Sequence, residues 1–381
     1  MRTSRLALIP AAALALAAPL TACSSDDSST GTESAEATSE ETSEPAPQET
    51  QAATAEADSS PVNVVATTTM LGSVASQIVT CANPESTVTT LMPVGADPHD
   101  FSPSSAQVAE MVSAQVVIAN GLDLEAGLDD ALENAASDGA TVIEIADLVD
   151  PIPFGEGGHD HGDDEHSDDA YSDEAKEDDH DHDHGDDHSH DDEAKEEDHD
   201  HDHDHGDEDP HFWFDMNRMA TAAQIIGDEL ASDNGQVYAD CGAQVADEIR
   251  AAEADVRALL ESVPADQRVL ITDHDALDYL ADAYGYEIAG TVIPAGTTLA
   301  EPSSADLADL VATMQSEGVR AIFTNTADPT ALSEAVAEEV GGYVQVVPLY
   351  VGSLGGPGSG AEDYISMMRT NAERIYAALT S

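Results

Sequence analysis

Basic side chains are scarce in this sequence: 11 Lys and Arg stand against 78 Asp and Glu over 381 residues, a formal net charge of −67. So acidic a surface repels phosphate, which argues against sequence-independent nucleic-acid binding and against attraction to anionic membranes. Aromatic residues make up only 4%, so a platform on which bases or sugars stack is not expected. With 41% hydrophobic residues, the chain can still build a core, and its length favours two domains.

Several catalytic signatures are also absent. The sequence contains no HExxH, no GxSxG and no Walker lysine motif, which are typical of zinc proteases, serine hydrolases and NTPases. The glycine-rich run at 355–360 does not have the spacing of a dinucleotide-binding turn and is predicted to be a loop. Any ATP hydrolysis that the function requires must therefore come from a partner.

The first 22 residues are typical of an export signal. Arg2 and Arg5 precede an apolar stretch that is short and ends in small residues, unlike a membrane span. Residues 20–23, Leu-Thr-Ala-Cys, resemble the lipobox of bacterial lipoproteins; the resemblance implies cleavage before Cys23 and diacylation of its sulfur. Residues 23–60 are acidic, Ser-rich and without hydrophobic periodicity. We expect them to form a disordered tether that holds a soluble body at the outer face of the bacterial cell membrane.

Cysteine is rare, with three residues in the chain. Once Cys23 carries a lipid, Cys81 and Cys241 remain, and two thiols outside the cytoplasm tend to pair. Sequence alone does not show whether their Cα atoms come within bridging distance. A disulfide and two buried free thiols both stay open.

From residue 62 onward, short β-branched runs alternate with amphipathic helical stretches, a pattern that indicates parallel βαβ units. Strands are predicted at 62–67, 86–92, 116–119, 141–145, 268–272, 287–292, 319–323 and 343–347, and helices at 70–80, 104–113, 124–136, 216–230, 275–284, 303–317, 329–340 and 361–379. A long helical pattern over 235–261 separates the first set of predicted strands and helices from the second. We predict an α/β fold with two lobes, 61–233 and 263–381, joined by a long rigid helix at 234–262.

Only three histidines lie in the part of the chain expected to fold: His99, His211 and His274. Each falls in a loop after a strand or at a helix start, which is where open parallel sheets bind ligands. Two of them share the triplet Asp-Pro-His, and an aspartate near each can accept the second ring N–H, as metal-ligating histidines require. Imidazole suits Zn, Cu, Ni and Fe(II), and three histidines are compatible with tetrahedral zinc in the cleft between the lobes.

Five segments resemble the zinc and manganese substrate-binding lipoproteins of bacterial ABC importers, the cluster A-I family: DPHDFSPSS from Asp97, DPHFWFD from Asp209, TDHDAL from Thr272, TVIPAGTTLAEPS from Thr291 and YISMMRTNAERIYAAL from Tyr364. The similarity covers about 61–154 and 210–381. It implies two (β/α) lobes that clamp one metal ion, with His99, His211 and His274 as ligands, no enzyme activity, and an ABC permease with its ATPase subunit as partners.

One position departs from that family. Its members often supply a carboxylate ligand in a segment that runs roughly Thr-Asp-Ser-Leu-Gly, where this chain has Val-Gly-Ser-Leu-Gly from Val351. Gly352 therefore stands where the aspartate is expected, and the fourth ligand must be water or a carboxylate from elsewhere. Loss of an anionic oxygen ligand favours Zn(II) over the harder Mn(II).

Between the two halves of the similarity lies an acidic insert, 156–209, with 12 of the 15 histidines. A 19-residue tandem copy within it has no apolar face to bury, so we expect a disordered segment rather than a folding repeat. Alternating His and Asp predict a metal-collecting tract that keeps ions close to His211. The proposed auxiliary ligands are His159, His161, His166, His180, His182, His184, His188, His190, His199, His201, His203 and His205.

The sequence thus predicts an extracytoplasmic, lipid-anchored monomer that captures Zn(II) as its transported ligand and delivers it to an ABC permease. Three alternatives remain: a manganese-delivering member of the same family; a zinc-dependent hydrolase or lyase with Asp100, Asp273 or Asp275 as base; and a surface adhesin or zinc buffer that serves no permease. Hydrolytic activity would favour the enzyme, and loss of metal uptake on deletion would favour the importer.

Overall fold

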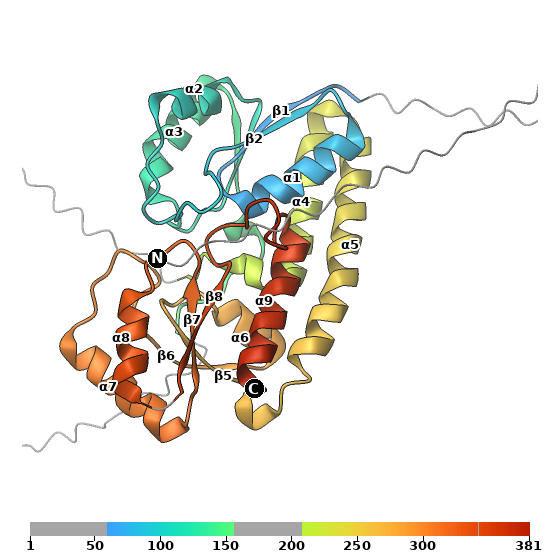
Figure 1. Cartoon of the computed structure of the whole chain (residues 1–381). Helices are drawn as coiled ribbons and strands as arrows, with labels where there is room; N and C mark the ends of the chain where they lie inside the picture. Colours follow the sequence, from blue (N-terminus) through green and yellow to red (C-terminus); the bar gives the residue numbers. More distant parts are fainter. Residues whose placement is uncertain (1–58, 156–207, 342) are drawn as a thin grey trace, which may run out of the picture. The chain divides into compact units, whose positions relative to one another are not determined.

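Two parallel four-stranded sheets form the framework of the protein (Figure 1), seen in a computed structural model that describes residues 59–155, 208–341 and 343–381. The first sheet has the order β2-β1-β3-β4 and the second β6-β5-β7-β8. The strands are β1 (Asn63–Ala66), β2 (Thr87–Thr90), β3 (Val116–Ala119), β4 (Thr141–Glu144), β5 (Val269–Thr272), β6 (Glu287–Thr291), β7 (Ala321–Asn325) and β8 (Gln345–Leu349). The predicted fold class, two α/β lobes, is confirmed.

Helices cover both faces of each sheet, as parallel sheets require. They are α1 (Thr69–Ala82), α2 (Ser105–Ser113), α3 (Asp129–Asp138), α4 (Met216–Asn234), α5 (Val237–Leu260), α6 (Asp278–Tyr284), α7 (Ser304–Glu317), α8 (Ala331–Val340) and α9 (Tyr364–Leu379), with 3₁₀ turns at Ala126–Leu128, Ala146–Leu148, Phe212–Phe214 and Ala265–Gln267. The predicted signal peptide with Cys23, nearly all of the predicted tether and the histidine-rich tract lie outside the described residues.

The long helix α5 connects the lobes, packing on α1 of the first lobe and on α9 of the second. It follows α4 after a break at Gly235, whose φ of 107° favours glycine. The two helices approach so closely that a Cβ on Gly227 would lie 2.8 Å from the Cα of Gly242. The helices predicted at 216–230 and 235–261 are both present, as α4 and α5. Gly242, inside α5, lies where the two helices pack most closely.

Three apolar clusters stabilise the molecule. One lies between the first sheet and α2 and α3, and another between the second sheet and α7 and α8. The largest is continuous across both lobes, with buried residues from α1, α4, α5 and α9 as well as from β1 and β7. Because this core is shared, we expect motion of one lobe against the other to be limited.

Several helices begin later than the sequence predicts; α9, for example, starts at Tyr364 and not at residue 361. Two of the delays change the loops at the carboxyl ends of strands. The helix expected from residue 275 starts at Asp278, because the backbone N–H of Asp275 donates to the carbonyl of Ala295 and holds residues 273–277 in a loop. The helix expected from residue 124 opens with a 3₁₀ turn before α3. Both differences lengthen the loops at the carboxyl ends of strands, where the histidines lie.

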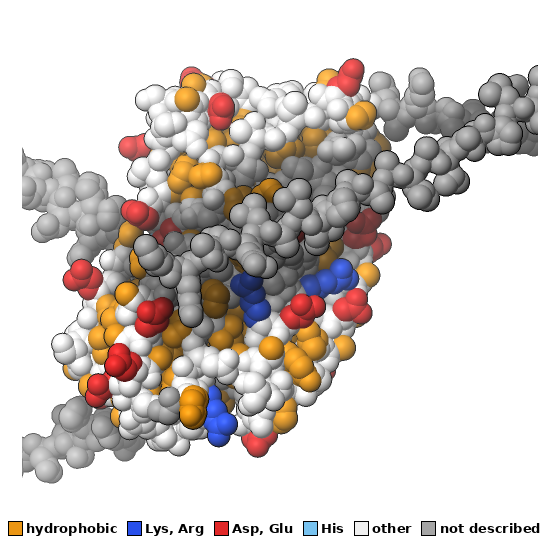
Figure 2. All heavy atoms as spheres, in the orientation of Figure 1, with side chains coloured by type: hydrophobic (Ala, Val, Ile, Leu, Met, Phe, Trp, Pro, Cys, Tyr) orange, Lys and Arg blue, Asp and Glu red, His pale blue; other side chains and the backbone are white. Residues whose placement is uncertain are grey.

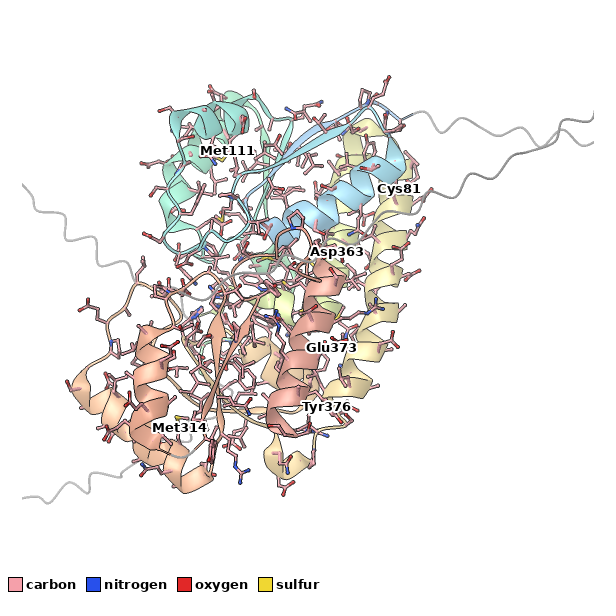
Figure 3. The ribbon with its side chains drawn as sticks, in the orientation of Figure 1. Cys81, Met111, Met314, Asp363, Glu373 and Tyr376 are labelled. Carbon is pink, nitrogen blue, oxygen red and sulfur yellow. A yellow bond between two sulfur atoms is a disulfide. The ribbon has the colours of Figure 1, made fainter. Side chains whose placement is uncertain are left out.

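Cys81 on α1 and Cys241 on α5 form a disulfide, with their Cα atoms 6.0 Å apart. Figure 3 labels Cys81 at the end of α1 that lies beside α5. Of the two alternatives that the sequence leaves open, the structure has the bridge. It ties the first lobe to the connecting helix.

The surface carries the acidic excess of the composition. On the face shown in Figure 2, Asp and Glu side chains are scattered over both lobes and Lys and Arg occupy few positions. Among the described residues, no helix combines the length and apolar character needed to cross a membrane.

Candidate metal centre

Three imidazoles from distant parts of the chain meet between the lobes. The ring centroids of His99, His211 and His274 lie 5.3 to 5.6 Å from one another. One ligand nitrogen from each lies within 4.8 Å of the other two. His211 and His274 are buried, and His99 is half-buried. In the described ranges, these residues form the one group of His, Cys, Asp or Glu side chains with spacing suited to a metal ion.

His99 is held by the loop between β2 and α2. The backbone N–H of His99 donates to Asp97 Oδ1 at 3.1 Å, a turn that Pro98 supports by restricting the backbone between them. The other carboxylate oxygen of Asp97 accepts a hydrogen bond from the Thr298 hydroxyl, which belongs to the second lobe. The position of His99 is therefore coupled to a contact across the cleft.

His211 is anchored by its own neighbour, Asp209. Asp209 Oδ1 accepts the backbone N–H of His211 at 2.9 Å and lies 2.7 Å from its Nδ1. Since a carboxylate only accepts, Nδ1 carries the proton and Nε2 presents its lone pair to the centre. The flanking backbone is fixed from both lobes, because Asn120 donates to the Pro210 carbonyl and Tyr279 to the Asp209 carbonyl.

His274 directly follows β5 and repeats this design with a different partner. Asp273 Oδ1 lies 2.9 Å from the Nδ1 of His274 and accepts its backbone N–H at 2.9 Å. The second oxygen of Asp273 accepts the backbone N–H of Asn325, at the end of the neighbouring strand β7. The adjacent strands β5 and β7 therefore both help to orient the imidazole of His274.

The separation of two ring nitrogens suits a small cation. His99 Nε2 and His211 Nε2 are 3.3 Å apart. Two nitrogens bound to a tetrahedral zinc at about 2.0–2.1 Å lie about 3.3–3.4 Å from each other. In one tautomer His99 Nε2 donates a hydrogen bond to His211 Nε2, and in the other both nitrogens present lone pairs that a shared cation can bind.

Burial and nearby charges shift the pKa values of His211 and His274 in opposite directions. Burial, and next the charge of His274, keep the pKa of His211 well below its ordinary value, so this ring stays neutral. Burial also lowers the pKa of His274, but the hydrogen bond to Asp273 and the charges of Asp273 and Asp328 outweigh it, and the net shift is upward. Burial raises the pKa of Asp209 to about 7. Protons therefore compete with a metal more strongly at His274 than at His211.

Gly352 lies close to the centre but offers it no ligand. A Cβ at this position would lie 2.7 Å from Pro98 Cδ, so the backbone of the loop after β8 packs directly on the loop that carries His99. Among the described residues, no carboxylate joins the three imidazoles as a ligand within 4.8 Å.

Two cavities flank the imidazoles. The larger, about 450 Å³, has His99 in its wall and is otherwise mostly apolar. The smaller, about 240 Å³, contains His274 and four aspartates, Asp97, Asp100, Asp273 and Asp328. Asp100 and Asp275, nominated from the sequence as bases, line the smaller and the larger cavity respectively.

Four residues that fix the histidine loops were missed by the sequence reasoning: Asn120, Tyr279, Thr298 and Asn325. The repeated Asp-Pro-His triplet is a signal for Asp97 and Asp209, because an aspartate two residues before a histidine can accept its backbone N–H. The four missed residues act from remote segments, and nothing local in the sequence marks them.

A model of the family described as zinc-uptake complex component A, periplasmic, matches residues 64–378. The chain belongs to this family. It therefore belongs to the cluster A-I zinc and manganese solute-binding proteins, which are metal-binding components of ABC importers and not an enzyme family.

Relatives with both metals in their names resemble the chain. The manganese-binding lipoprotein MntA of Halalkalibacterium halodurans is 23% identical over 85% of this chain and 90% of its own length. The zinc-binding protein TroA of Treponema pallidum is 24% identical over 85% of this chain and 91% of its own length. The solved structure of TroA covers 84% of this chain and 99% of its own, with a TM-score of 0.66 and 22% identity. That likeness supports the two-lobed fold.

Proposed function

We propose that this protein captures Zn(II) outside the cytoplasm and delivers it to the permease of an ABC importer. The observation that carries the proposal is the convergence of His99, His211 and His274, with two Nε2 atoms 3.3 Å apart. Membership of the zinc-uptake component A family supports the delivery role. In this proposal zinc is cargo, held by neutral imidazoles and released at the permease.

Zinc is proposed over manganese because the donor set is nitrogen only. Manganese is a harder ion that prefers carboxylate and carbonyl oxygen, whereas imidazole suits zinc. The packing of Gly352 against Pro98 leaves no room for the aspartate that would supply such an oxygen. Manganese delivery is the second candidate, since a relative of similar identity is named a manganese-binding lipoprotein.

A hydrolase that uses the same centre is less well supported. Catalysis requires a general base beside the metal-bound water. Both carboxylate oxygens of Asp273 already accept hydrogen bonds, from His274 and from Asn325. We infer that Asp209 and Asp273 serve to orient His211 and His274.

The remaining parts of the proposal rest on the sequence. Cys23 carries the lipid that anchors a monomer to the outer face of the membrane, and the tract from His159 to His205 gathers metal near the cleft. The tract raises the local metal concentration without forming the tight site. Proton competition should weaken zinc binding as the pH falls through the pKa of His274, which lies above the ordinary value for histidine.

Competition with a chromophoric chelator tests the proposal. We expect His99→Ala, His211→Ala and His274→Ala each to weaken tight zinc binding by far more than deletion of residues 159–205 does. The matched control is deletion of the tract alone, which should remove weak sites and leave one tight ion per chain. If the tract deletion abolishes the tight site while a variant lacking all three imidazoles keeps it, the assignment is wrong.

Manganese in the same titration distinguishes the two cargo candidates. A nitrogen-only set should bind Zn(II) at least about a hundredfold more tightly than Mn(II), as expected from the order of stabilities of divalent ions. Equal affinities would favour the manganese-delivering alternative.

A further inference from the structure

The larger cavity beside the centre is in contact with all three segments that bear the histidines. Its wall includes His99 itself, Pro210 next to His211, and Asp275 next to His274. Its volume, about 450 Å³, falls within the roughly 300–1,000 Å³ typical of small-molecule sites. A hydrated metal ion alone needs no cavity of this size and composition.

The wall of the larger cavity is mostly apolar, with carboxylate side chains at one part of it. Apolar contacts come from both lobes, from Leu122, Leu124 and Phe154 on one side and from Ile288 and Leu299 on the other. Asp275 and Asp278 lie in the wall on the second lobe, and the lining includes neither Lys nor Arg among the described residues. The two carboxyl groups hydrogen-bond to each other. An anionic guest would meet like charge from this pair, whereas an ammonium group would meet opposite charge.

The first-lobe wall has a strained backbone. Leu122 and Asp123 have φ values of 52° and 56°, in the left-handed region that bulky residues avoid, directly after Gly121 at 88°. Backbone strain of this kind persists only where the surrounding structure imposes it, and it concentrates at ligand sites. The turn places Leu122 in the cavity wall, which indicates a shaped surface and not an accidental gap.

Among the described residues, the centre has three protein ligands. Three imidazoles fill three positions of a tetrahedral zinc, and no described carboxylate joins them. Gly352, in the loop after β8, has no side chain to offer, and its backbone packs on Pro98. The fourth donor must come from solvent, from a guest or from a part of the chain outside the described residues.

We propose that the cavity binds a small organic amine with a nitrogen donor, so that the metal is captured together with this ligand. The donor would complete the coordination beside His99, the apolar wall would cover the body of the molecule, and Asp275 and Asp278 would hold its ammonium group. This inference rests on the proposed metal-binding function and specifies the chemical form of the cargo.

Histamine is a suitable probe because it combines an imidazole donor with an ammonium group. Imidazole-4-acetate is its matched control, since it keeps the donor and replaces the ammonium by a carboxylate. The full-length protein is loaded with half an equivalent of Co(II), so that only the tightest site is occupied, and the visible spectrum of the ion is followed during titration. Cobalt reports directly on its ligands.

We expect histamine to change the cobalt spectrum saturably, and to tighten apparent Co(II) binding by about tenfold, as reciprocal coupling requires. Imidazole-4-acetate should have a much smaller effect. Ala126→Phe, which places a large ring at the exposed rim of the cavity, should abolish the histamine response relative to its own metal-only spectrum. Ala251→Phe, on an exposed position of α5 away from the cavity, should keep it.

The outcomes separate the two proposals. Failure of the protein to bind cobalt or zinc tightly overturns the proposed function itself. Tight metal binding with no histamine response, or with an equal response in the Ala126→Phe variant, overturns only the amine site and leaves water as the fourth ligand. A third outcome is that histamine changes the cobalt spectrum only in a variant that lacks residues 159–205. That result would overturn the proposal of an external amine, because it would mean that imidazoles of the chain itself occupy the cavity.

Discussion

A buried carboxylate, Asp209, orients the imidazole of His211 in the candidate centre. Asp209 is fully buried, and one of its oxygens has no hydrogen-bond partner among the described groups. Burying such a group without full pairing costs free energy. A cation bound by His211 offsets this cost, because the negative charge then stabilises the metal-bound imidazole through Nδ1.

Replacing Asp209 with Asn tests this role. The amide keeps the shape but removes the charge that supports His211, so zinc affinity should fall by about 10–100-fold. Since a buried charge disappears, the thermal midpoint of the metal-free protein should stay the same or rise. Chelator competition and a thermal melt measure the two effects, and Asp228→Asn on the exposed face of α4 is the control. A large loss of stability with unchanged zinc affinity would show that Asp209 is merely structural.

Glu125 makes stability depend on pH. It is buried, accepts hydrogen bonds from Thr67 and from the backbone of Asn120, and burial raises its pKa from 4.5 to about 7. The folded state therefore binds this proton more tightly than the unfolded chain. The resulting stabilisation is complete below the unfolded pKa and is lost as the pH rises through about 7, by roughly 3 kcal/mol.

Glu125→Gln should remove that dependence. The difference in unfolding free energy between the variant and the parent should be small at pH 5 and should favour the variant by a few kcal/mol at pH 8. Urea unfolding at the two pH values measures it. Glu133→Gln, an exposed position on α3 with the same change in net charge, is the control and should show no such trend. A parallel shift for both variants would contradict burial as the cause.

At the scale of elements, the loop after β8 joins the lobes through backbone contacts. Gly352 packs on Pro98, while the hydroxyl of Ser353 accepts the backbone N–H of Gly95 at 2.8 Å. The buried Trp213 donates to the Val351 carbonyl. This loop therefore positions the His99 segment by close packing, a role that excludes a side chain at Gly352.

Gly352→Ala and Gly356→Ala form a matched pair in this loop. Alanine at 352 would overlap Pro98, whereas a Cβ at 356 meets nothing within 4 Å. Overpacking should destabilise the first variant by about 1–3 kcal/mol and weaken zinc binding by shifting His99. The second should be close to neutral. Thermal melts with and without zinc provide the comparison, and equal midpoints for the two variants would argue against the contact.

At the scale of the whole molecule, the shared core and the disulfide restrain the lobes. The bridge between Cys81 and Cys241 closes a loop of 160 residues. Such a cross-link stabilises chiefly by restricting the unfolded chain. Together with the continuous apolar cluster around α4 and α5, it favours small rotations of the lobes over wide hinge opening.

A double variant, Cys81→Ala with Cys241→Ala, should lose about 2–5 kcal/mol of unfolding free energy. Because neither residue belongs to the cleft, zinc affinity should stay within a few-fold of the parent. Denaturant unfolding in oxidising and reducing buffers checks the first point, and the parent should converge on the variant only when reduced. Persistence of the difference under full reduction would mean that lost packing, not the bridge, is responsible.

Local signals explain which features could be predicted. Alternation of β-branched runs and helical stretches was enough for the two parallel sheets, because each pattern reflects burial within a few residues of chain. The histidines were recognised for a similar reason, as each follows a strand or precedes a helix. The delayed start of α6 was missed because a contact between Asp275 and Ala295, distant in sequence, decides it.

By itself, the sequence determined the α/β class, the candidate imidazoles and the absence of an aspartate at 352, since each depends on residue type and local pattern. Only the tertiary structure decided that the three rings meet, that Cys81 pairs with Cys241, and that Pro98 closes the space at Gly352. It also revealed the apolar cavity beside His99. These features depend on contacts between residues that are many positions apart, and such contacts arise only when two lobes pack on a common core.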